Sequence, residues 1–360
     1  MAQIDAFFKL MNEQGASDLH LVAGQQPVLR IQGDLERVKY KVLDNDSLKK
    51  MLYEIATEDK VKVFEETGDV DFAYEIPGLA RYRANFFQQK YGVGAVFREI
   101  PSSIMTCEQL GLPPVVKRLA TLPRGLVLVT GPTGSGKSTT LAAIVHEANK
   151  NRKEHILTIE DPIEFVHKSE KAVVNHREVG MHTRSFSAAL RGALREDPDI
   201  ILVGEMRDLE TISLAIEASS TGHLVFGTLH TSSAAKTVDR IIEVFPMTQQ
   251  EQVRNTLSDG IRAVLSQTLF RRIDKRGRIV ALEIMIANPA VRNLIREGKT
   301  FQIPSMLQTG KKYGMQTLDD SIMGLLTKKI INADDAYTKC NDKARFLPFL
   351  KNPPADFTEV

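Results

Sequence analysis

The second half of the chain alternates between short, solidly apolar runs and longer helical stretches. From residue 126 onward the apolar runs cover 126–129, 156–159, 200–203 and 224–229. Each run is apolar at consecutive positions rather than at every second position, which is typical of strands buried on both faces of a parallel sheet. Because helical stretches separate the runs, the pattern predicts a doubly wound α/β sheet.

Residues 1–100 have a different pattern, which predicts a small mixed domain. An early helix carries Phe7, Phe8, Leu10 and Met11 on one face and precedes β-rich runs separated by Gly and Pro turn signals. These runs cover 19–22, 28–31, 70–74, 81–87 and 94–99.

The remaining segments complete the predicted domain organisation. The stretch 101–124 contains four prolines and is predicted to be an interdomain linker. Residues 125–345 are predicted to form the second domain, which is expected to be mainly helical after about residue 250, with a short hairpin-like break at 274–277. The last stretch, 346–360, contains three prolines and is predicted to be an irregular tail.

The composition is that of an ordinary globular protein, and 360 residues suffice for two domains. The composition argues against a nucleic-acid partner. Proteins that bind nucleic acids usually carry a basic stripe with interleaved aromatic residues, whereas this chain has a net charge of +2, scattered Lys and Arg residues and no Trp. The two cysteines, Cys107 and Cys340, form no C-x-x-C pair, so no zinc site is predicted. The sequence has no signal peptide and no membrane-length apolar run, so we expect a cytoplasmic protein without direct membrane insertion.

A glycine-rich motif directly follows the first apolar run. Residues 131–138 read GPTGSGKS and fit the phosphate-binding pattern G-x-x-x-x-G-K-[ST]. Glycines let consecutive N–H groups turn toward phosphates, and the start of the next helix adds positive potential. Lys137 is predicted to reach the β- and γ-phosphates of ATP, and Ser138 to hold Mg²⁺. The predicted ATP-binding set also includes Gly134, Ser135, Gly136 and Thr139.

Polar residues follow the other three apolar runs at the points where those runs end. Glu160, Asp161 and Glu164 follow the second run, Glu205 closes the third, and His230 follows the fourth. Ligands of open α/β sheets bind at the carboxyl ends of the strands. These side chains are therefore expected at one edge of the sheet, together with the phosphate loop, as a hydrolytic site.

Charge and placement suggest a role for each of these side chains. Glu205 occupies the position of a Walker B carboxylate and is predicted to activate water, with Mg²⁺ binding or a purely structural surface carboxylate as the alternatives. Glu160 and Asp161 are candidates for a carboxylate near Mg²⁺, and Glu164 is a candidate catalytic residue. Helix capping would also explain acidic residues at these positions. His230 is expected to sense the γ-phosphate.

Four sequence blocks together give the chain a family likeness. They are the phosphate loop and the blocks TIEDPIEF at 158–165, DPDIILVGEMRD at 197–208 and TGHLVFGTLH at 221–230. With these blocks the chain resembles the secretion-type ATPases over roughly residues 1–340, and most closely the branch that retracts type IV pili. The resemblance implies a PAS-like α+β N-terminal domain, followed by a RecA-like P-loop ATPase domain with a mainly helical C-terminal part.

Two features favour retraction over pilus assembly within this family. The stretch 290–297, AVRNLIRE, is similar to the retraction-type signature. From the residues alone it is an amphipathic helix that starts at Asn288 and Pro289 and ends at Gly298. The extra N-terminal domain and the four-cysteine zinc motif that assembly relatives usually carry are absent from this sequence.

The resemblance also implies an assembly and a set of partners. A homohexamer that hydrolyses ATP with Mg²⁺ is expected to drive pilus disassembly, as a cytoplasmic protein held peripherally at the inner membrane. An inner-membrane pilus platform protein is the expected partner, and a paralogous retraction ATPase is a further candidate. Arg81 and Arg83, on one face of a strand, and Arg98 on a nearby strand are candidates for phosphate contacts made in trans. A solvated edge strand is the alternative for these arginines.

Other functions could use the same nucleotide-binding core. The chain could be another secretion or conjugation ATPase, or a ring that binds ATP without hydrolysing it. A nucleic-acid translocase on a RecA-like core would need a basic, aromatic-lined channel that the sequence does not indicate. A GTPase switch is excluded because the Asn-Lys-x-Asp motif that reads the base is missing.

Overall fold

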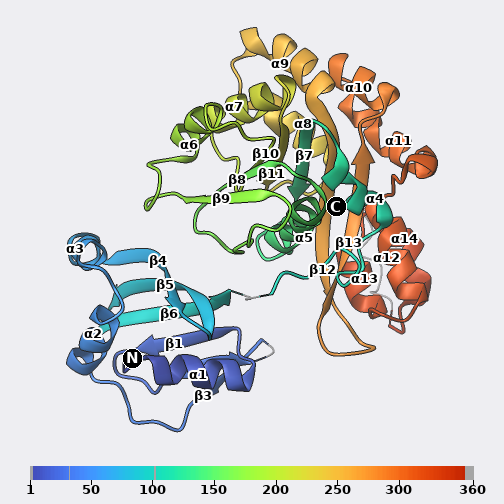
Figure 1. The fold of residues 1–360 in the computed structure, drawn as a ribbon. Coiled ribbons are helices and arrows are strands. Elements are labelled where there is room, and N and C mark those ends of the chain that lie inside the picture. Colours follow the sequence, from blue (N-terminus) through green and yellow to red (C-terminus); the bar gives the residue numbers. More distant parts are fainter. Residues whose placement is uncertain (1–2, 32, 101–102, 353–360) are drawn as a thin grey trace. The chain divides into compact units, whose positions relative to one another are not determined.

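The computed structural model describes residues 3–31, 33–100 and 103–352, and within it the chain divides into two compact units (Figure 1). The first unit consists of the chain up to Ser103 together with Pro162–Val166. The second unit consists of Ile104–Asp161 and of the chain from His167 onward.

An antiparallel six-stranded sheet forms the first unit, with strand order β3-β2-β1-β6-β5-β4. Its strands are β1 (Asp18–Val22), β2 (Val28–Ile31), β3 (Asp34–Arg37), β4 (Asp69–Ile76), β5 (Ala80–Gln89) and β6 (Gly92–Ile100). Its helices are α1 (Asp5–Gln14), α2 (Asn45–Tyr53) and α3 (Glu58–Thr67). Along β5, Tyr82 and Phe86 are buried whereas Arg83 is exposed, because only one face of the sheet is covered.

An aromatic core holds the helices of the first unit on the sheet. Phe8 of α1 stacks on Tyr82 with ring centroids 4.3 Å apart and meets Phe97 edge-on at 4.9 Å. Phe64 of α3 meets Phe86 edge-on at 6.0 Å. The predicted early helix and the five predicted β-rich runs are confirmed. Strand β3 was missed because all four of its residues are exposed and its sequence, DLER, carries no apolar signal.

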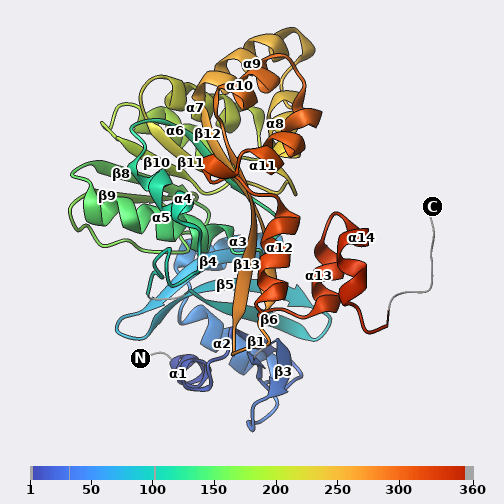
Figure 2. The ribbon, with the colours of Figure 1, turned by 90° about the vertical axis from the view of Figure 1, so that its right-hand side faces the viewer.

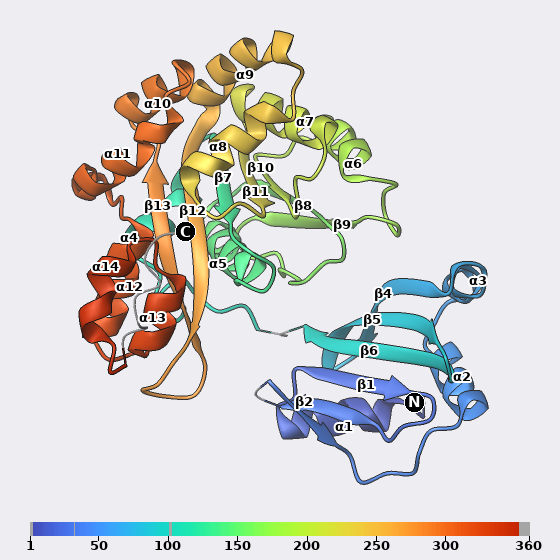
Figure 3. The same cartoon turned by 180° about the vertical axis from the view of Figure 1, so that it is seen from behind.

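The second unit contains a seven-stranded sheet with the order β13-β12-β7-β11-β10-β8-β9, seen from behind in Figure 3. The strands are β7 (Gly125–Thr130), β8 (His155–Glu160), β9 (Val173–Glu178), β10 (Ile200–Val203), β11 (Leu224–Leu229), β12 (Ile261–Arg271) and β13 (Arg278–Ile286). All neighbours pair in parallel except β12 and β13, which form an antiparallel hairpin. The four apolar runs are therefore strands of a parallel α/β sheet, as predicted.

Two hydrophobic cores, one on each face of this sheet, explain why the runs are apolar at every position. On β7, Leu126 and Leu128 belong to one core, and Val127 and Val129 belong to the other. The second core also contains residues of α4 (Pro114–Arg118) and α5 (Lys137–Asn151). The first core contains residues of α6 (Phe186–Ala193), α7 (Leu209–Ser220), α8 (Ala234–Glu243), α9 (Met247–Gly260), α10 (Pro289–Arg296) and α11 (Ile303–Thr309).

Most of the segment expected to link the domains is packed into the second unit. Cys107, Leu112, Val116 and Leu119 are buried in the core that α5 covers. A stretch with this much buried apolar surface behaves as part of a domain rather than as a connection. Residues 101–102 of the predicted linker lie outside the described residues.

The region after residue 250 contains the expected helices and the expected hairpin-like break, but the strands on either side of the break are longer than expected. The chain over 261–286 forms the long hairpin β12–β13, whose turn includes the predicted break at 274–277. Ser266 and Gln267 interrupt the apolar pattern of β12, so the sequence alone does not distinguish a strand from a helix, and pairing with β7 decides it. Strand β9 was missed for a related reason, since VVNHRE is largely polar.

Helices follow the hairpin, and the C-terminal ones pack on its far end. Phe270 and Ala281 of the hairpin share a core with residues of α12 (Leu318–Thr327), α13 (Ala333–Lys339) and α14 (Lys343–Phe346), as Figure 2 shows. The predicted start of α10 is confirmed, because the Asn288 side chain accepts a hydrogen bond from the Val291 N–H. The predicted tail includes the 3₁₀ turn Leu347–Phe349, and residues 353–360 lie outside the described part.

Candidate nucleotide-binding site

The phosphate loop connects β7 to α5 through three glycines with positive φ. Gly131, Gly134 and Gly136 have φ values of 141°, 77° and 87°, which side-chain-bearing residues rarely adopt. A Cβ atom on Gly131 would lie 2.5 Å from the Gln267 carbonyl oxygen. Gly136 occupies the N-cap of α5 without a capping side chain. The first N–H groups of α5 are therefore suited to an anionic ligand.

Lys137 lies across this loop. Its Nζ donates hydrogen bonds to the carbonyl oxygens of Gly131, at 3.0 Å, and Pro132, at 3.2 Å. Ser138 and Thr139 occupy the first turn of α5, and both are half-buried. The structure thus brings all the predicted loop residues into one turn at the carboxyl end of β7.

Strand β12 packs against the phosphate loop, a contact that the sequence pattern does not predict. Gln267, which is 2% exposed, donates from Nε2 to the Ser135 carbonyl oxygen at 2.6 Å. The hydroxyls of Ser266 and Thr130 share a hydrogen bond of 2.8 Å at the end of β7. The only signal in the sequence was a polar Ser-Gln pair within an otherwise apolar stretch.

Glu205 lies at the end of β10 and contacts His230 and Arg207. Its Oε1 accepts from His230 Nε2 at 2.8 Å and from Nε of Arg207. The prediction that Glu205 and His230 share one edge is thus met. Arg207 was missed, although it lies within the block 197–208.

These neighbours keep Glu205 ionised. Partial burial raises the pKa of Glu205, but the hydrogen bonds from Arg207 and His230 outweigh it and hold this pKa below its ordinary value. The Arg207 pKa is raised, first by the Glu205 hydrogen bond and further by the charge of Asp161. Glu205, Arg207, His230 and Asp161 therefore form one electrostatic cluster.

Glu160, at the end of β8, is buried next to Gly204. A Cβ atom on Gly204 would lie 3.4 Å from Glu160 Cγ, so the glycine makes room for this side chain. Glu160 Oε1 lies 3.9 Å from His176 Nδ1, an atom that also pairs with the Thr158 hydroxyl at 2.8 Å. Glu164, by contrast, is exposed and belongs by its contacts to the first unit.

The strand order explains how these groups share one edge. β7 pairs with β11, β11 with β10 and β10 with β8, all in parallel. Four groups therefore follow the carboxyl ends of neighbouring strands: the phosphate loop, Glu160, Glu205 and the turn that starts at His230. The Ser138 hydroxyl and the two carboxylates are oxygen ligands of the kind that Mg²⁺ prefers. Within the ranges that the structure describes, no group of three or more His, Cys, Asp or Glu side chains forms a metal site by itself.

The three predicted arginines lie in the first unit, on the sheet face opposite the aromatic core. Arg83 pairs directly with Arg98 across β5 and β6, and Arg81 is two residues away on the same face. Arg98 Nε donates to Asp18 Oδ1 at 2.8 Å, and Arg83 Nε lies 3.5 Å from Asp71 Oδ1. The phosphate loop, in contrast, lies in the second unit.

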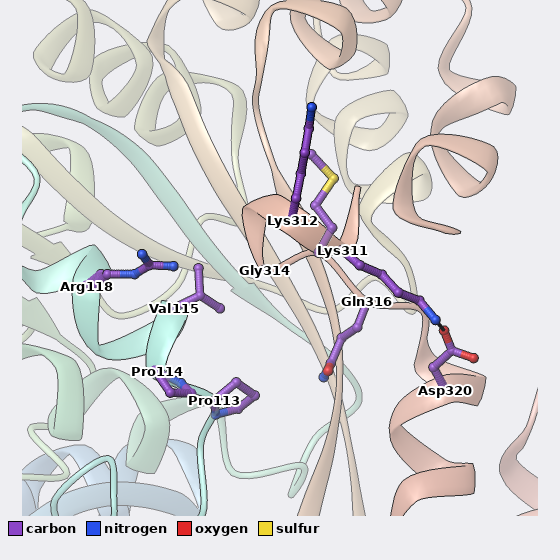
Figure 4. A pocket seen from close by; sticks show the side chains of 10 residues that line it. Pro113, Pro114, Val115, Arg118, Lys311, Lys312, Gly314, Gln316 and Asp320 are labelled. Carbon is purple, nitrogen blue, oxygen red and sulfur yellow. Dashed lines mark ion pairs between the residues drawn. The ribbon is translucent and has the colours of Figure 1, made fainter. Parts of the chain in front are cut away.

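A separate pocket of about 510 Å³ lies between α4 and the segment that precedes α12 (Figure 4). It is lined by Pro113, Pro114, Val115, Arg118, Lys311, Lys312, Gly314, Met315, Gln316 and Asp320. None of these is a predicted nucleotide ligand, so this pocket is distinct from the site at the phosphate loop. No helix among the residues with described placement is long and apolar enough to cross a membrane.

Comparisons with known proteins agree with this geometry. The family model of the type II/IV secretion system proteins matches residues 2–302. The chain is 55% identical to the type IV pilus retraction ATPase PilT of Pseudomonas aeruginosa over 334 residues, which cover 93% of this chain and 97% of that protein. It is 52% identical to a twitching motility protein of Neisseria gonorrhoeae over 310 residues, 86% of this chain and 83% of the relative.

A solved structure shows the same fold. The crystal structure of the pilus retraction motor PilT with bound ADP superposes with a TM-score of 0.88 at 45% identity, covering 96% of this chain and 98% of that one. The matched residues include both units of the fold and the phosphate loop. The chain belongs to the type II/IV secretion system protein family and, within it, to the group of the type IV pilus retraction ATPases.

Proposed function

We propose that this protein is an ATP-hydrolysing motor that powers the retraction of type IV pili. The observation that carries the proposal is the shared edge of the sheet, where a phosphate loop meets an ionised Glu205 held by His230. The long match to a pilus retraction ATPase supports the cellular role.

Nucleotide binding follows from the loop geometry. The N–H groups of the loop and of the first turn of α5 bind the phosphates. Lys137, which contacts the Gly131 and Pro132 carbonyls, exchanges these neutral partners for phosphate oxygens of higher charge. Gln267 keeps Ser135 in place while this exchange occurs.

Mg²⁺ is the metal that fits this donor set. The Ser138 hydroxyl and the carboxylates of Glu160 and Asp161 would hold the ion, directly or through water. When bound, the ion neutralises negative charge on the phosphates as the reaction proceeds.

Glu205 acts on the attacking water. The contacts from His230 and Arg207 both use Oε1, so Oε2 is the oxygen that accepts the proton of the water. His230 orients the carboxylate by the bond from Nε2, and through this bond would relay the presence of the γ-phosphate to Glu205. Glu164 is a further candidate at this step.

The active form is proposed to be a homohexamer in which the first unit of one copy completes the site of the next. Arg81, Arg83 and Arg98 present guanidinium groups on the open face of a sheet, as contacts to a neighbour's phosphates would require. The proposed partners are an inner-membrane pilus platform protein and a paralogous retraction ATPase. The motor would thus be a cytoplasmic protein, peripheral at the inner membrane.

Replacing Glu205 by Gln should abolish turnover and preserve nucleotide binding. The amide keeps the volume but cannot accept the proton, so kcat should fall by about 10²–10⁴-fold. Phosphate release and titration with a fluorescent ADP analogue measure the two quantities. Glu217→Gln, an exposed change on α7, is the control and should leave both unchanged. Equal turnover in Glu205→Gln and wild type would contradict the proposed role.

Removing Arg207 should make hydrolysis more sensitive to acid. The pKa of Glu205 is lowered in the folded protein, so Glu205 becomes protonated and stops acting as a base only when the pH falls below that lowered pKa. In Arg207→Ala this pKa rises, and the acidic limb of kcat/KM should move to higher pH. Profiles that extend from neutral pH to below the ordinary Glu pKa of about 4.3 test this, with Arg191→Ala on α6 as the control. If the acidic limb of kcat/KM lies at the same pH in Arg207→Ala and wild type, Arg207 does not lower the pKa of Glu205.

Mixing two inactive variants tests whether the arginines act between subunits. Arg83→Ala and Lys137→Ala should each lose most ATPase activity. A mixed ring contains interfaces that combine an intact loop with an intact Arg83, so mixing should restore part of the activity. Arg37→Ala, on the exposed strand β3, is the control and should be active alone. The absence of recovery in rings proven to be mixed would exclude action in trans.

Deletion of the gene tests the cellular role. Cells without a retraction motor should carry abundant surface pili and lack surface motility. Wild-type protein should restore motility in these cells, whereas the Glu205→Gln protein should not. Bald cells would instead indicate pilus assembly, and unchanged pili and motility would point to another secretion system.

A further inference from the structure

Three buried polar side chains lie together on the β12–β13 hairpin, level with the end of β7. Ser266 and Gln267 are each 2% exposed, and Glu283 is 8% exposed. Ser266 and Glu283 are directly paired across the two strands. Buried polar groups cost free energy unless they are hydrogen-bonded, so their partners indicate what they do.

Gln267 contacts the phosphate loop at several points. Its Nε2 holds the Ser135 carbonyl at 2.6 Å and lies 3.4 Å from the position of a Cβ atom on Gly136. Its backbone carbonyl oxygen lies against Gly131, where a Cβ atom would approach to 2.5 Å, so only a glycine fits there. The loop therefore packs on both the side chain and the backbone of this one residue.

The amide of Gln267 is not explained by packing alone. Its Oε1 is buried and has no hydrogen-bond partner among the described residues. An apolar side chain of similar shape would avoid this unfavourable burial of an acceptor. The amide is therefore useful for its donor, which points at the loop.

Glu283 contacts the segment that follows His230. Its Oε1 accepts a hydrogen bond of 2.7 Å from the N–H of Ala234, the first residue of α8. Burial raises the pKa of Glu283, and this hydrogen bond opposes the rise. Beside it, the Ser266 hydroxyl pairs with Thr130 at the end of β7. The hairpin thus contacts both chain segments that carry the proposed chemistry.

We infer that Gln267 and Glu283 are positioning residues, through which the β12–β13 hairpin sets the phosphate loop and the segment carrying His230 relative to each other. The two strands pair without interruption from Ala263 to Arg271, so the two contact points cannot move independently. Gln267 shapes the loop for phosphate, and Glu283 holds the start of α8 so that His230 meets Glu205. The inference rests on the proposed ATPase function.

The two positions should affect different steps. Gln267→Met keeps the volume and removes the donor, so the Kd for Mg-ADP and the KM for ATP should rise about five- to tenfold while kcat changes little. Glu283→Met removes the acceptor, so kcat should fall about five- to tenfold with the Kd for ADP unchanged. Glu283→Gln retains an acceptor oxygen and should restore most of the lost kcat.

The experiment uses the full-length assembled protein. Steady-state hydrolysis of Mg-ATP gives KM and kcat, and titration with a fluorescent ADP analogue gives the Kd. Thr268→Val, an isosteric change one residue along β12, is the matched control and should leave all three quantities unchanged. Thermal melting without nucleotide identifies any variant that is poorly folded, and for such a variant Glu283→Leu, which also lacks the acceptor, and Gln267→Glu replace the methionine changes. Gln267→Glu places a carboxylate against the Ser135 carbonyl and should weaken ADP binding further.

The outcomes separate the inference from the proposed function. If the folded variants that remove the Gln267 donor or the Glu283 acceptor keep wild-type constants, or if both positions shift KM and kcat alike, the inference is wrong. The double variant Gln267→Met/Glu283→Met should lose less kcat/KM than the product of the single losses, because both act through one hairpin. Strictly multiplicative losses would refute the coupling. A wild-type protein that binds ADP but does not hydrolyse ATP would instead refute the proposed function, and the Gln267 titration would still test the loop contact.

Discussion

Parallel pairing of β7, β11, β10 and β8 is the interaction on which the rest of the second unit depends. Because these strands run in the same direction and in register, their carboxyl ends meet at one edge of the sheet. The loops that follow them leave backbone and side-chain polar groups there, whereas the strands themselves are buried in two apolar cores. The buried sheet thereby supports a polar site at its edge.

Electrostatics then determines what this edge can do. Partial burial alone would raise the pKa of Glu205, but Arg207 and His230 lower it below its ordinary value. The phosphate loop has the opposite character, because its ligands are uncharged N–H groups and one lysine. A base and an anion-binding loop thus lie on neighbouring parts of one edge, which is the arrangement that attack of water on a phosphate requires.

Local signals in the sequence predict part of this structure, whereas contacts between distant segments decide the rest. The phosphate loop, Glu205 and His230 could be predicted because glycine spacing and strand ends are visible in consecutive residues. Strand β12 could not, since Ser266 and Gln267 are polar and acquire their partners from Thr130 and Ser135, more than a hundred residues earlier. The linker was misjudged because prolines signal irregular backbone but do not reveal burial.

By itself the sequence determined the fold class, the four parallel strands β7, β8, β10 and β11 and the chemical identity of the nucleotide loop. These depend on apolar periodicity and on glycine conformations, which are properties of neighbouring residues. Only the tertiary structure decided that Arg207 and His230 bind the same oxygen of Glu205, and that the β12–β13 hairpin lies under the phosphate loop. The reason is physical: hydrogen bonds and pKa shifts depend on distances between side chains, and those distances are set by strand order rather than by position along the chain.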